Sequence, residues 1–340
     1  MDLDSTILCR YGEQEGSLKG YNPKKPGRPS HHPLVAFLAE GRRLLWATLR
    51  SGNSGSANGS VEFLKQALTV LPEGQRIGLV RADSGFFEKR LLEYLESQEL
   101  PYIIVARLTP IVRKLVIHQI PAATWRTVAR GIEVADLEVS LPNWKNVKRR
   151  FVCLRQEISE RPQASGRRLI DCPGYTYRVM VTSVPYGAEI VTRMYAGRAD
   201  SENRIKELKE DLSLDTFCLK PFNATDAAFR MGGVLYNLLA DFRETVLPRS
   251  WFEKRLRALR DFVFLVGADL IHQGRRVRVR FAMPEPDRAE FLRRLCTVSQ
   301  GLPIAAQLEC TLSEQTPTHP DKIVSPISLL PPVSLLNQSP

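Results

Sequence analysis

The sequence predicts an α/β fold in which a mixed sheet is interrupted by a β-rich insertion. Three observations support this prediction. Short strands and helices alternate up to residue 107, segments within 120–186 alternate apolar and polar residues, and helical periodicity returns at residue 188. We therefore expect a sheet whose first part precedes the insertion and whose covering helices follow it.

The first third of the chain supplies the opening elements of this sheet. After the expected hairpin, which turns at Gly41, a loop of Gly, Ser and Asn leads to a helix. Ser60 is expected to cap that helix, because its hydroxyl can accept a backbone N–H. The expected elements are a strand at 2–9, the hairpin at 34–53, a helix at 61–71, a strand at 76–83, a helix at 87–98 and a buried strand at 101–107.

Helix is expected again after the β-rich region. The expected elements are helices at 188–212 and 223–245, a short helix near 251–260, a β pair over 262–283 and a helix at 285–298. Residues 311–340 hold six prolines among Ser, Thr and Leu, a composition typical of a poorly ordered tail.

These changes of pattern divide the chain into five parts. The parts are a first section of the core at 1–107, a β-rich insertion at 108–187, a second section of the core at 188–245, an α/β region at 246–300 and a Pro-rich disordered tail at 301–340.

The chain is strongly basic. It has 340 residues, and 48 Lys and Arg face 37 Asp and Glu, which gives a formal net charge of +11. This excess favours a polyanionic partner, a nucleic acid before a membrane surface.

Cysteine usage and hydropathy indicate a cytoplasmic protein. The six cysteines form no C-x-x-C pair, which argues against a zinc site or a disulfide scaffold and fits a reducing cytosol. The pair His31–His32 has no metal-ligand partners at helical spacing. No stretch approaches the roughly 20 apolar residues of a membrane span, and the N-terminus does not resemble a signal peptide.

Three carboxylates occupy distinctive points in the expected fold. Asp4 lies inside the first strand, Asp83 ends the strand at 76–83, where open α/β sheets expose their sites, and Glu202 lies on the later helix. Hard oxygen ligands from separate elements are suited to Mg²⁺ or Mn²⁺, with positions left for water and phosphate. Two such ions about 3.5–4 Å apart can stabilise the attacking and leaving oxygens of a phosphoryl displacement.

The helix that carries Glu202 is dense with charge. At about 100° per residue, Glu202 and Lys209 border its apolar stripe, while Glu207 points to water. A charge near a core needs a partner, a metal or a function. The alternative is a solvated surface helix stabilised by i,i+4 ion pairs. Asp200 and Glu207 are assigned to the surface, whereas Asp2 alternates onto the face of Asp4 and remains a rival ligand.

The spacing within this helix is specific. Tyr195, Arg198, Glu202 and Lys209 are separated by two, three and six residues, which resembles the Y-R-E-K signature of DDE-type bacterial transposases of the insertion sequence 4 superfamily. "DLDST" and "RADSGFF" resemble the two Asp motifs of these enzymes, and "EGSLKGYNPKKPGRPSHHPLVAF" resembles the 1380 group within the superfamily.

This resemblance implies an RNase H-like core with a β-rich insertion between the second Asp and the Glu helix. It implies that Asp4, Asp83 and Glu202 are the catalytic metal ligands, with Mg²⁺ or Mn²⁺ as the cofactor. It also implies that Tyr195, Arg198 and Lys209 line the site and hold phosphates of DNA. The implied partners are the transposon ends and target DNA, and a second copy of the chain in the DNA complex.

The basic loop, residues 20–33 (GYNPKKPGRPSHHP), is expected to contact DNA. Its Lys24, Lys25 and Arg28 would meet backbone phosphates, and its prolines lower the cost of ordering them. The alternative is a solvated surface loop. Arg50 and the adjoining "SGNSGSANGS" loop are further DNA-contact candidates, whereas Trp46 and Trp251 are expected in the core.

The chain departs from the family at its start. Such transposases carry a considerable region before the first Asp, whereas three residues precede Asp4 here, so the chain is interpreted as N-terminally truncated and its first strand is expected to be frayed. Three functions follow. The first is a metal-dependent transposase, and the alternative is a non-catalytic DNA-binding or dimerising fragment that interferes with the full-length enzyme. An unrelated RNase H-like nuclease is a weaker third.

Overall fold

The computed structural model describes residues 1–158, 174–216, 219–247, 249–265, 268–273, 276–281, 308–310 and 325–329. The chain divides into two compact units, Met1–Val234 and Leu235–Pro340. Every residue singled out above for catalysis or DNA binding lies in the first unit.

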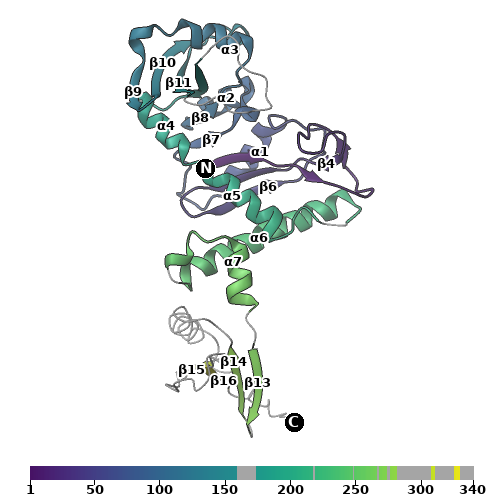
Figure 1. Cartoon of the computed structure of the whole chain (residues 1–340). Coiled ribbons are helices and arrows are strands. Elements are labelled where there is room, and N and C mark those ends of the chain that lie inside the picture. The colour runs from purple at the N-terminus through teal and green to yellow at the C-terminus, as the bar shows by residue number, and fades with distance from the viewer. Residues whose placement is uncertain are drawn as a thin grey trace. The chain divides into compact units, whose positions relative to one another are not determined.

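Within the described residues, a nine-stranded sheet is the centre of the first unit (Figure 1). Its strands, in spatial order, are β6 (Arg43–Thr48), β5 (Leu34–Leu38), β1 (Asp2–Ser5), β7 (Val80–Ala82), β8 (Tyr102–Val105), β12 (Tyr175–Thr182), β11 (Arg149–Glu157), β10 (Ile132–Val139) and β9 (Arg126–Ala129). Strands β1, β7 and β8 are parallel, and their outer neighbours β5 and β12 are antiparallel to them.

Five of these strands form an RNase H-like core. These strands, numbered one to five along the chain, are β1, β5, β6, β7 and β8. Their spatial order in the sheet is 3-2-1-4-5. The predicted α/β fold class is therefore confirmed. The β-rich insertion is also present, and its strand β12 pairs with β8, so the insertion continues the same sheet.

β1 is a central strand with neighbours on both sides. All four of its residues pair with β5, and Asp2 and Leu3 also pair with β7. Asp2, Leu3 and Asp4 are all buried. The expectation that this strand is frayed is therefore wrong, because β5 pairs with it along its whole length and β7 pairs with its first two residues.

The α-helices of the described residues are α1 (Ser60–Thr69), α2 (Lys89–Ser97), α3 (Pro110–Leu115), α4 (Ala188–Ala196), α5 (Ala199–Lys206), α6 (Phe222–Thr245) and α7 (Leu256–Leu259). A π-helical segment, Glu207–Asp211, directly continues α5.

Helices cover both faces of the sheet. Leu3 of β1 lies in the main apolar core with Phe63 of α1 and Leu92 of α2. On the opposite face, Val191 of α4 belongs to a second apolar cluster that includes Ile103 of β8. Because successive strand residues alternate between faces, Asp2 and Asp4 lie on the face opposite Leu3, toward α4 and α5.

Two local expectations differ from the structure. Gly59, not Ser60, is the N-cap of α1, and Ser60 is the first residue of the helix. Gly59 has φ +70°, which glycine adopts without a Cβ penalty, so the glycine makes the turn into the helix. Strand β16 (Ser325–Leu329) forms within the tail that was expected to be disordered. The helix expected at 285–298 lies outside the described residues.

A small three-stranded sheet anchors the basic loop. Its order is β2 (Leu8–Cys9), β4 (Pro29–His31), β3 (Leu18–Lys19). Since β2 follows β1 and β4 leads into β5, the segment between β3 and β4 is held near the carboxyl end of β1.

The second unit contains the expected β pair. Strands β13 (Ala268–Gln273) and β14 (Arg276–Phe281) join β16 and β15 (Leu308–Cys310) in a four-stranded sheet. Trp251 is buried, as expected, and Trp46 of the first unit is half-buried, packed against the main apolar core with Arg230 over its ring. No helix among the described residues combines the length and apolarity needed to cross a membrane.

Candidate active site

The three predicted carboxylates line one cavity. Asp4 comes from β1, Asp83 directly follows β7, and Glu202 lies in the first turn of α5. Parallel β1 and β7 end at the same edge of the sheet, and α5 crosses beside it. The cavity has a volume of about 260 Å³ and is also lined by Ser5, Thr6, Lys24, Arg198, Ile205, Lys206, Lys209 and Glu210.

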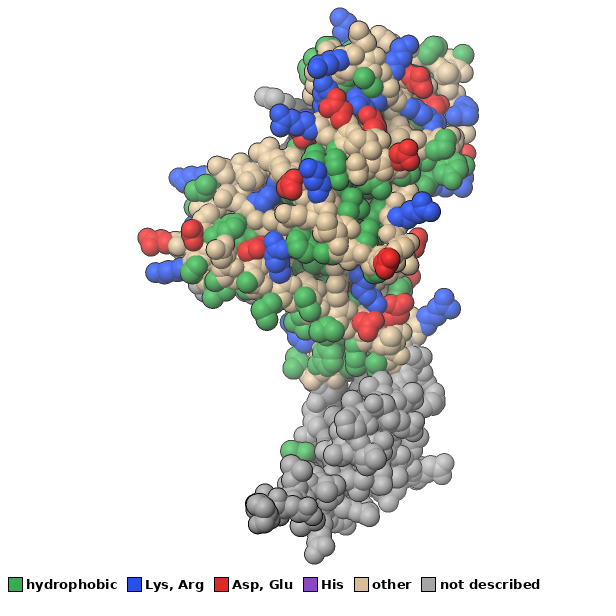
Figure 2. Space-filling model, turned by 180° about the vertical axis from the view of Figure 1, so that it is seen from behind, with side chains coloured by type: hydrophobic (Ala, Val, Ile, Leu, Met, Phe, Trp, Pro, Cys, Tyr) green, Lys and Arg blue, Asp and Glu red, His purple; other side chains and the backbone are tan. Residues whose placement is uncertain are grey.

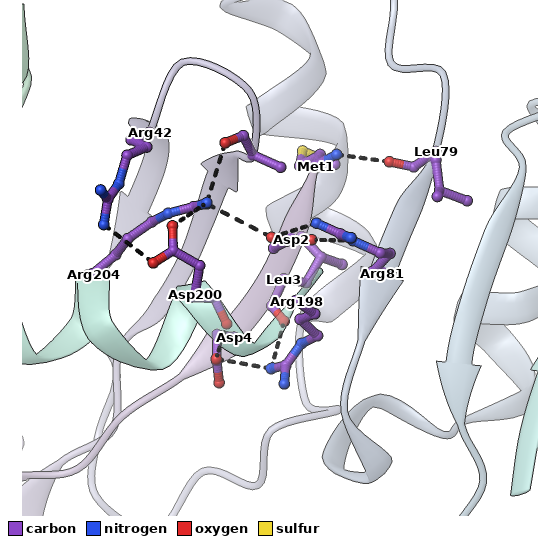
Figure 3. Close-up of polar contacts among 12 residues, drawn as sticks. Met1, Asp2, Leu3, Asp4, Arg42, Leu79, Arg81, Arg198, Asp200 and Arg204 are labelled. Carbon is purple, nitrogen blue, oxygen red and sulfur yellow. Dashed lines mark hydrogen bonds and ion pairs between the residues drawn. The ribbon is translucent and has the colours of Figure 1, made fainter. Parts of the chain in front are cut away.

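Asp4 is the most enclosed of the three carboxylates. Its Oδ2 lies 2.8 Å from a guanidinium nitrogen of Arg198 and accepts a hydrogen bond of 3.2 Å from Ser201 Oγ. Its Oδ1 accepts a hydrogen bond of 2.8 Å from the backbone N–H of Ser5. Arg198 also donates to the carbonyl of Leu3, so one arginine binds both the side chain and the backbone of β1 (Figure 3).

Burial raises the pKa of Asp4 to about 6, and the nearby charge of Asp83 acts in the same direction, while Arg198 opposes both. The buried position therefore disfavours the ionised carboxylate even with an arginine bound to it. A divalent cation would favour the ionised form.

Asp83 is held by the turn that follows β7. Its side chain caps the 3₁₀ turn Ser84–Phe86 by accepting a hydrogen bond of 2.9 Å from the N–H of Gly85. A Cβ on Gly85 would lie 2.8 Å from Cβ and Oγ of Ser56, so only glycine allows the loop to approach this closely. The turn thus fixes the backbone that carries the second carboxylate.

Glu202 lies on the exposed edge of α5, and the buried face of the helix differs from the prediction. Glu207 is 0% exposed, and Arg204 is 2% exposed. The prediction that Glu207 points to water is wrong. Arg204 and Glu207 are three residues apart and share the buried face of the helix. The surface below α5 carries charge, since Asp2 pairs there with Arg204, so it accepts charged side chains.

The donor set suits Mg²⁺ or Mn²⁺. Within the described part of the chain, no group of three or more His, Cys, Asp or Glu side chains is arranged closely enough to hold a metal ion. The cavity nevertheless has four carboxylates, the three predicted ones from separate elements and Glu210, and hard oxygen donors of this kind fit these cations. Asp2, the rival ligand, is instead paired with Arg81 and does not line the cavity.

The residues predicted to contact DNA fall into two groups. Lys24 and Lys209 line the carboxylate cavity, and Lys209 donates a hydrogen bond of 2.8 Å to the carbonyl of Ile7. Burial lowers the pKa of Lys209, and the nearby Lys24 adds to this effect. Tyr195, in contrast, is buried in the apolar cluster under α4, so its contact with DNA stays a prediction.

Lys25 and Arg28 of the basic loop gather around one aromatic ring. Lys25 Nζ lies 5.1 Å and the Arg28 guanidinium carbon 4.7 Å from the ring centroid of Tyr11, and Lys25 also bonds the Tyr11 hydroxyl. Both cations are exposed. On the face shown in Figure 2, Lys and Arg side chains are scattered among Asp and Glu.

Sequence reasoning missed a polar cluster next to the carboxylates. His32 is buried, and its two ring nitrogens lie 2.6 Å from the carbonyl of Ser54 and 3.1 Å from Ser5 Oγ. Ser5 Oγ in turn lies 2.8 Å from Ser56 Oγ. The signal available was the His31–His32 pair, whose partners come from loops distant in sequence.

Arg50 has a structural role. Its guanidinium donates to the carbonyls of His32, Gly55 and Asn58, so it holds the Gly- and Ser-rich loop in place. Burial lowers the pKa of Arg50 to about 10. Its predicted approach to DNA receives no support from this arrangement.

The comparisons with known proteins show the family of this chain. A family model described as "Transposase DDE domain group 1" matches residues 1–301. The chain belongs to this DDE transposase family. The predicted membership of the DDE transposases is therefore confirmed.

A comparison of this DDE transposase domain with curated proteins found no match. Among solved structures, it is similar to the chain of a piggyBac transposase synaptic complex with hairpin DNA. The identity is 13% and the TM-score 0.42, over 72% of this chain and 47% of that chain. The chain thus spans about half the length of that solved chain.

Proposed function

We propose that this chain is the catalytic part of an insertion-sequence transposase of the insertion sequence 4 superfamily, 1380 group. It would hydrolyse a phosphodiester at the end of the element and join the resulting 3′-hydroxyl to target DNA. The observation that carries the proposal is the convergence of Asp4, Asp83 and Glu202, from three separate elements, on one cavity bordered by lysines.

The carboxylates would hold Mg²⁺ or Mn²⁺, which would supply charge stabilisation for the attacking and leaving oxygens. The chain's own residues provide the rest of the site. Arg198 fixes Asp4 and β1 in position. Lys24 and Lys209 place positive charge at the cavity wall, where each can act as a point charge for a phosphate.

A second cavity supports a path for DNA. It has a volume of about 660 Å³ and shares Lys24, Asp83 and Lys209 with the carboxylate cavity. It extends to Lys25 and to Tyr21, a residue that is 77% exposed. A strand leaving the carboxylates along this cavity would pass from the site to the basic loop. We propose that Lys25 and Arg28 meet its backbone, and that a second copy of the chain binds the other end.

The experiment that tests the proposal is a cleavage and joining assay. The purified chain is mixed with a labelled duplex of the element's end, a target plasmid and Mg²⁺. The expected result is a nick at the end of the element and joined products. Binding without cleavage, combined with inhibition of an active transposase, would instead support the interfering fragment.

A further inference from the structure

Each proposed catalytic carboxylate has a charged neighbour two residues away that points into a buried ionic cluster. Asp2 precedes Asp4 by two residues, Arg81 precedes Asp83 by two, and Asp200 and Arg204 flank Glu202 by two on either side. Figure 3 shows Asp2, Arg81, Asp200 and Arg204 joined by ion pairs. We call these four residues the β1–α5 network.

Asp2 is the centre of this network. Its carboxylate is 0% exposed and is bound by Arg81 through two hydrogen bonds, of 2.6 Å from Nε and 3.0 Å from a terminal nitrogen. The other terminal nitrogen of Arg81 donates a hydrogen bond of 2.5 Å to the carbonyl of Met194 at the end of α4. Arg81 therefore joins β7 both to β1 and to the helix that precedes α5.

Arg204 joins α5 to the same carboxylate. One terminal nitrogen lies 3.6 Å from Asp2, and the other lies 3.0 Å from Asp200 and donates to the carbonyl of Ala39 at 3.1 Å. Arg42 completes the contacts by binding the other oxygen of Asp200 at 3.1 Å. The glutamate helix is thus joined to β1 by an ion pair, and to the loop after β5 by hydrogen bonds that involve Ala39 and Arg42.

The sheet register explains why this network lies beside the site. Phe37, Asp2, Arg81 and Ile103 are direct neighbours across β5, β1, β7 and β8, so they form one row on the face below the helices. Asp4 lies one pleat further along that face. α4 packs on the apolar end of this row, at Ile103, whereas α5 meets its charged part.

This difference has a physical consequence. The apolar contacts of α4 are non-directional, whereas α5 is held by contacts between charged groups. Paired guanidinium–carboxylate bonds are directional, and the loss of one buried partner leaves the other charge uncompensated. The contacts of Asp200 with Arg42, and of Arg204 with Ala39 and Asp2, therefore tie the helical turn that carries Glu202 to its surroundings on both sides.

We propose that the β1–α5 network positions Glu202 relative to Asp4 and Asp83, so that Asp2, Arg81, Asp200 and Arg204 are positioning residues for the metal-holding site. This inference rests on the proposed function. It also gives a role to the segment RADS, which occurs at 81–84 and 198–201. The arginine of the first copy binds Asp2, and the arginine of the second binds Asp4.

The test uses the full chain with three substitutions. Arg204→Met removes the buried arginine. Asp200→Asn weakens the network at a side chain that is 36% exposed, where a change is tolerated more easily. Arg193→Met, on the exposed face of α4, is the matched control, because it removes an arginine from an i,i+4 pair with Glu189 outside the network.

Three quantities are measured: Mn²⁺ affinity by electron paramagnetic resonance of the free ion, the Mg²⁺ concentration for half-maximal cleavage, and thermal unfolding without metal. Arg204→Met is expected to weaken Mn²⁺ binding by about tenfold or more, the range for lost outer-sphere support. The Mg²⁺ midpoint should rise in parallel, and Asp200→Asn should show a smaller shift of the same sign. Arg193→Met should match the unchanged chain.

Folded variants with unchanged Mn²⁺ affinity and Mg²⁺ midpoint would overturn the inference, even if their unfolding temperature falls. If Arg204→Met does not fold, Asp200→Asn decides by the same two quantities. An unchanged chain that neither binds Mn²⁺ nor cleaves would contradict the proposed function itself, and the inference with it. If the unchanged chain binds Mn²⁺ and cleaves DNA, and the variants match it in both quantities, only the inference is contradicted.

Discussion

Two groups of charged residues in the first unit are built in opposite ways. In the β1–α5 network, every side chain is bonded to an opposite charge, and Asp2 and Arg204 are almost completely buried. In the basic loop, Lys24, Lys25 and Arg28 are exposed, and two of them rest on the ring of Tyr11. Charges of the first kind hold the chain's own elements together. Charges of the second kind remain available to an external polyanion.

Loss of a site carboxylate should have the largest effect. Asp4→Asn, Asp83→Asn or Glu202→Gln is expected to lower strand cleavage in Mg²⁺ by about 10³-fold or more, because each removes a proposed ligand for the ions. DNA retention should stay near that of the unchanged chain. Gel assays of cleavage and binding check both quantities.

The matched control for this prediction is Glu62→Gln on α1, an exposed glutamate far from β1 in the chain. Glu207 is unsuitable as a control, because it is buried. An active Glu202→Gln variant would remove Glu202 from the site and leave the charges of α5 with a structural role only.

Neutralising the basic loop should change DNA binding without changing the fold. The triple variant Lys24→Ala, Lys25→Ala and Arg28→Ala should reduce the slope of log affinity against log salt by about 2.7, since each phosphate contact contributes about 0.9. The loss should be similar for all DNA sequences. Titrations by fluorescence anisotropy at several salt concentrations measure the slope.

An unchanged slope would show that the exposed cations of the loop are solvated only. Because Lys24 also lines the carboxylate cavity, the double variant Lys25→Ala, Arg28→Ala separates the two contributions. It should reduce the slope by about 1.8 and leave cleavage of bound DNA intact.

The anchor of the loop should respond to pH. His31 is buried, with one ring nitrogen 3.0 Å from Arg10 Nε and the other 2.9 Å from the carbonyl of Glu15. Burial lowers the pKa of His31, the carbonyl of Glu15 opposes this, and Arg10 adds to it. Because the pKa of His31 in the folded state is below 6.5, neutral His31 stabilises the fold above pH 6.5, and this stabilisation is lost as pH falls.

Urea unfolding at pH 7.5 and 5.5 measures this loss. The unchanged chain should lose more stability on acidification than His31→Gln, by at most about 1.4 kcal/mol per pH unit for one proton. His118→Gln changes an exposed histidine and should behave like the unchanged chain. Equal acid sensitivity in all three proteins would remove His31 as the titrating group.

The smallest effect is expected at Tyr11. Tyr11→Leu removes the ring on which Lys25 and Arg28 rest, so the two cations should lose a preferred position but keep their charge. DNA affinity should fall about two- to fivefold, in line with about 0.5–1 kcal/mol for an exposed cation–π contact, while the salt slope stays constant. A fall in the slope would mean that Tyr11 determines the number of phosphate contacts.

Local patterns predicted the elements well. Strand alternation and helix periodicity predicted the core strands, the insertion and the helices that follow it. The positions of Asp4 and Asp83 follow from the ends of strands, whereas Glu202 lines the same cavity from the exposed edge of α5, not from beside a buried stripe as predicted. These features depend on residues near in sequence, so single segments contain the signal.

The features that were missed depend on distant partners. Burial of Arg204 requires Asp2, 202 residues earlier, and the role of Arg50 requires carbonyls of a loop that closes around it. A helical projection assigns such charges to water, because charged residues are rarely buried unless paired. The partner of such a buried charge, here Asp2 for Arg204, is seen only in the tertiary structure.

The pairing of β12 with β8 makes the insertion part of the same hydrogen-bonded sheet as the strand that precedes Asp83. Peeling away β9 to β12 would leave the backbone groups of β8 without partners along one edge. The insertion and the core should therefore exchange their amide hydrogens as one cooperative unit. A force applied to the insertion would be transmitted by the hydrogen bonds between neighbouring strands to β7, the strand that directly precedes Asp83.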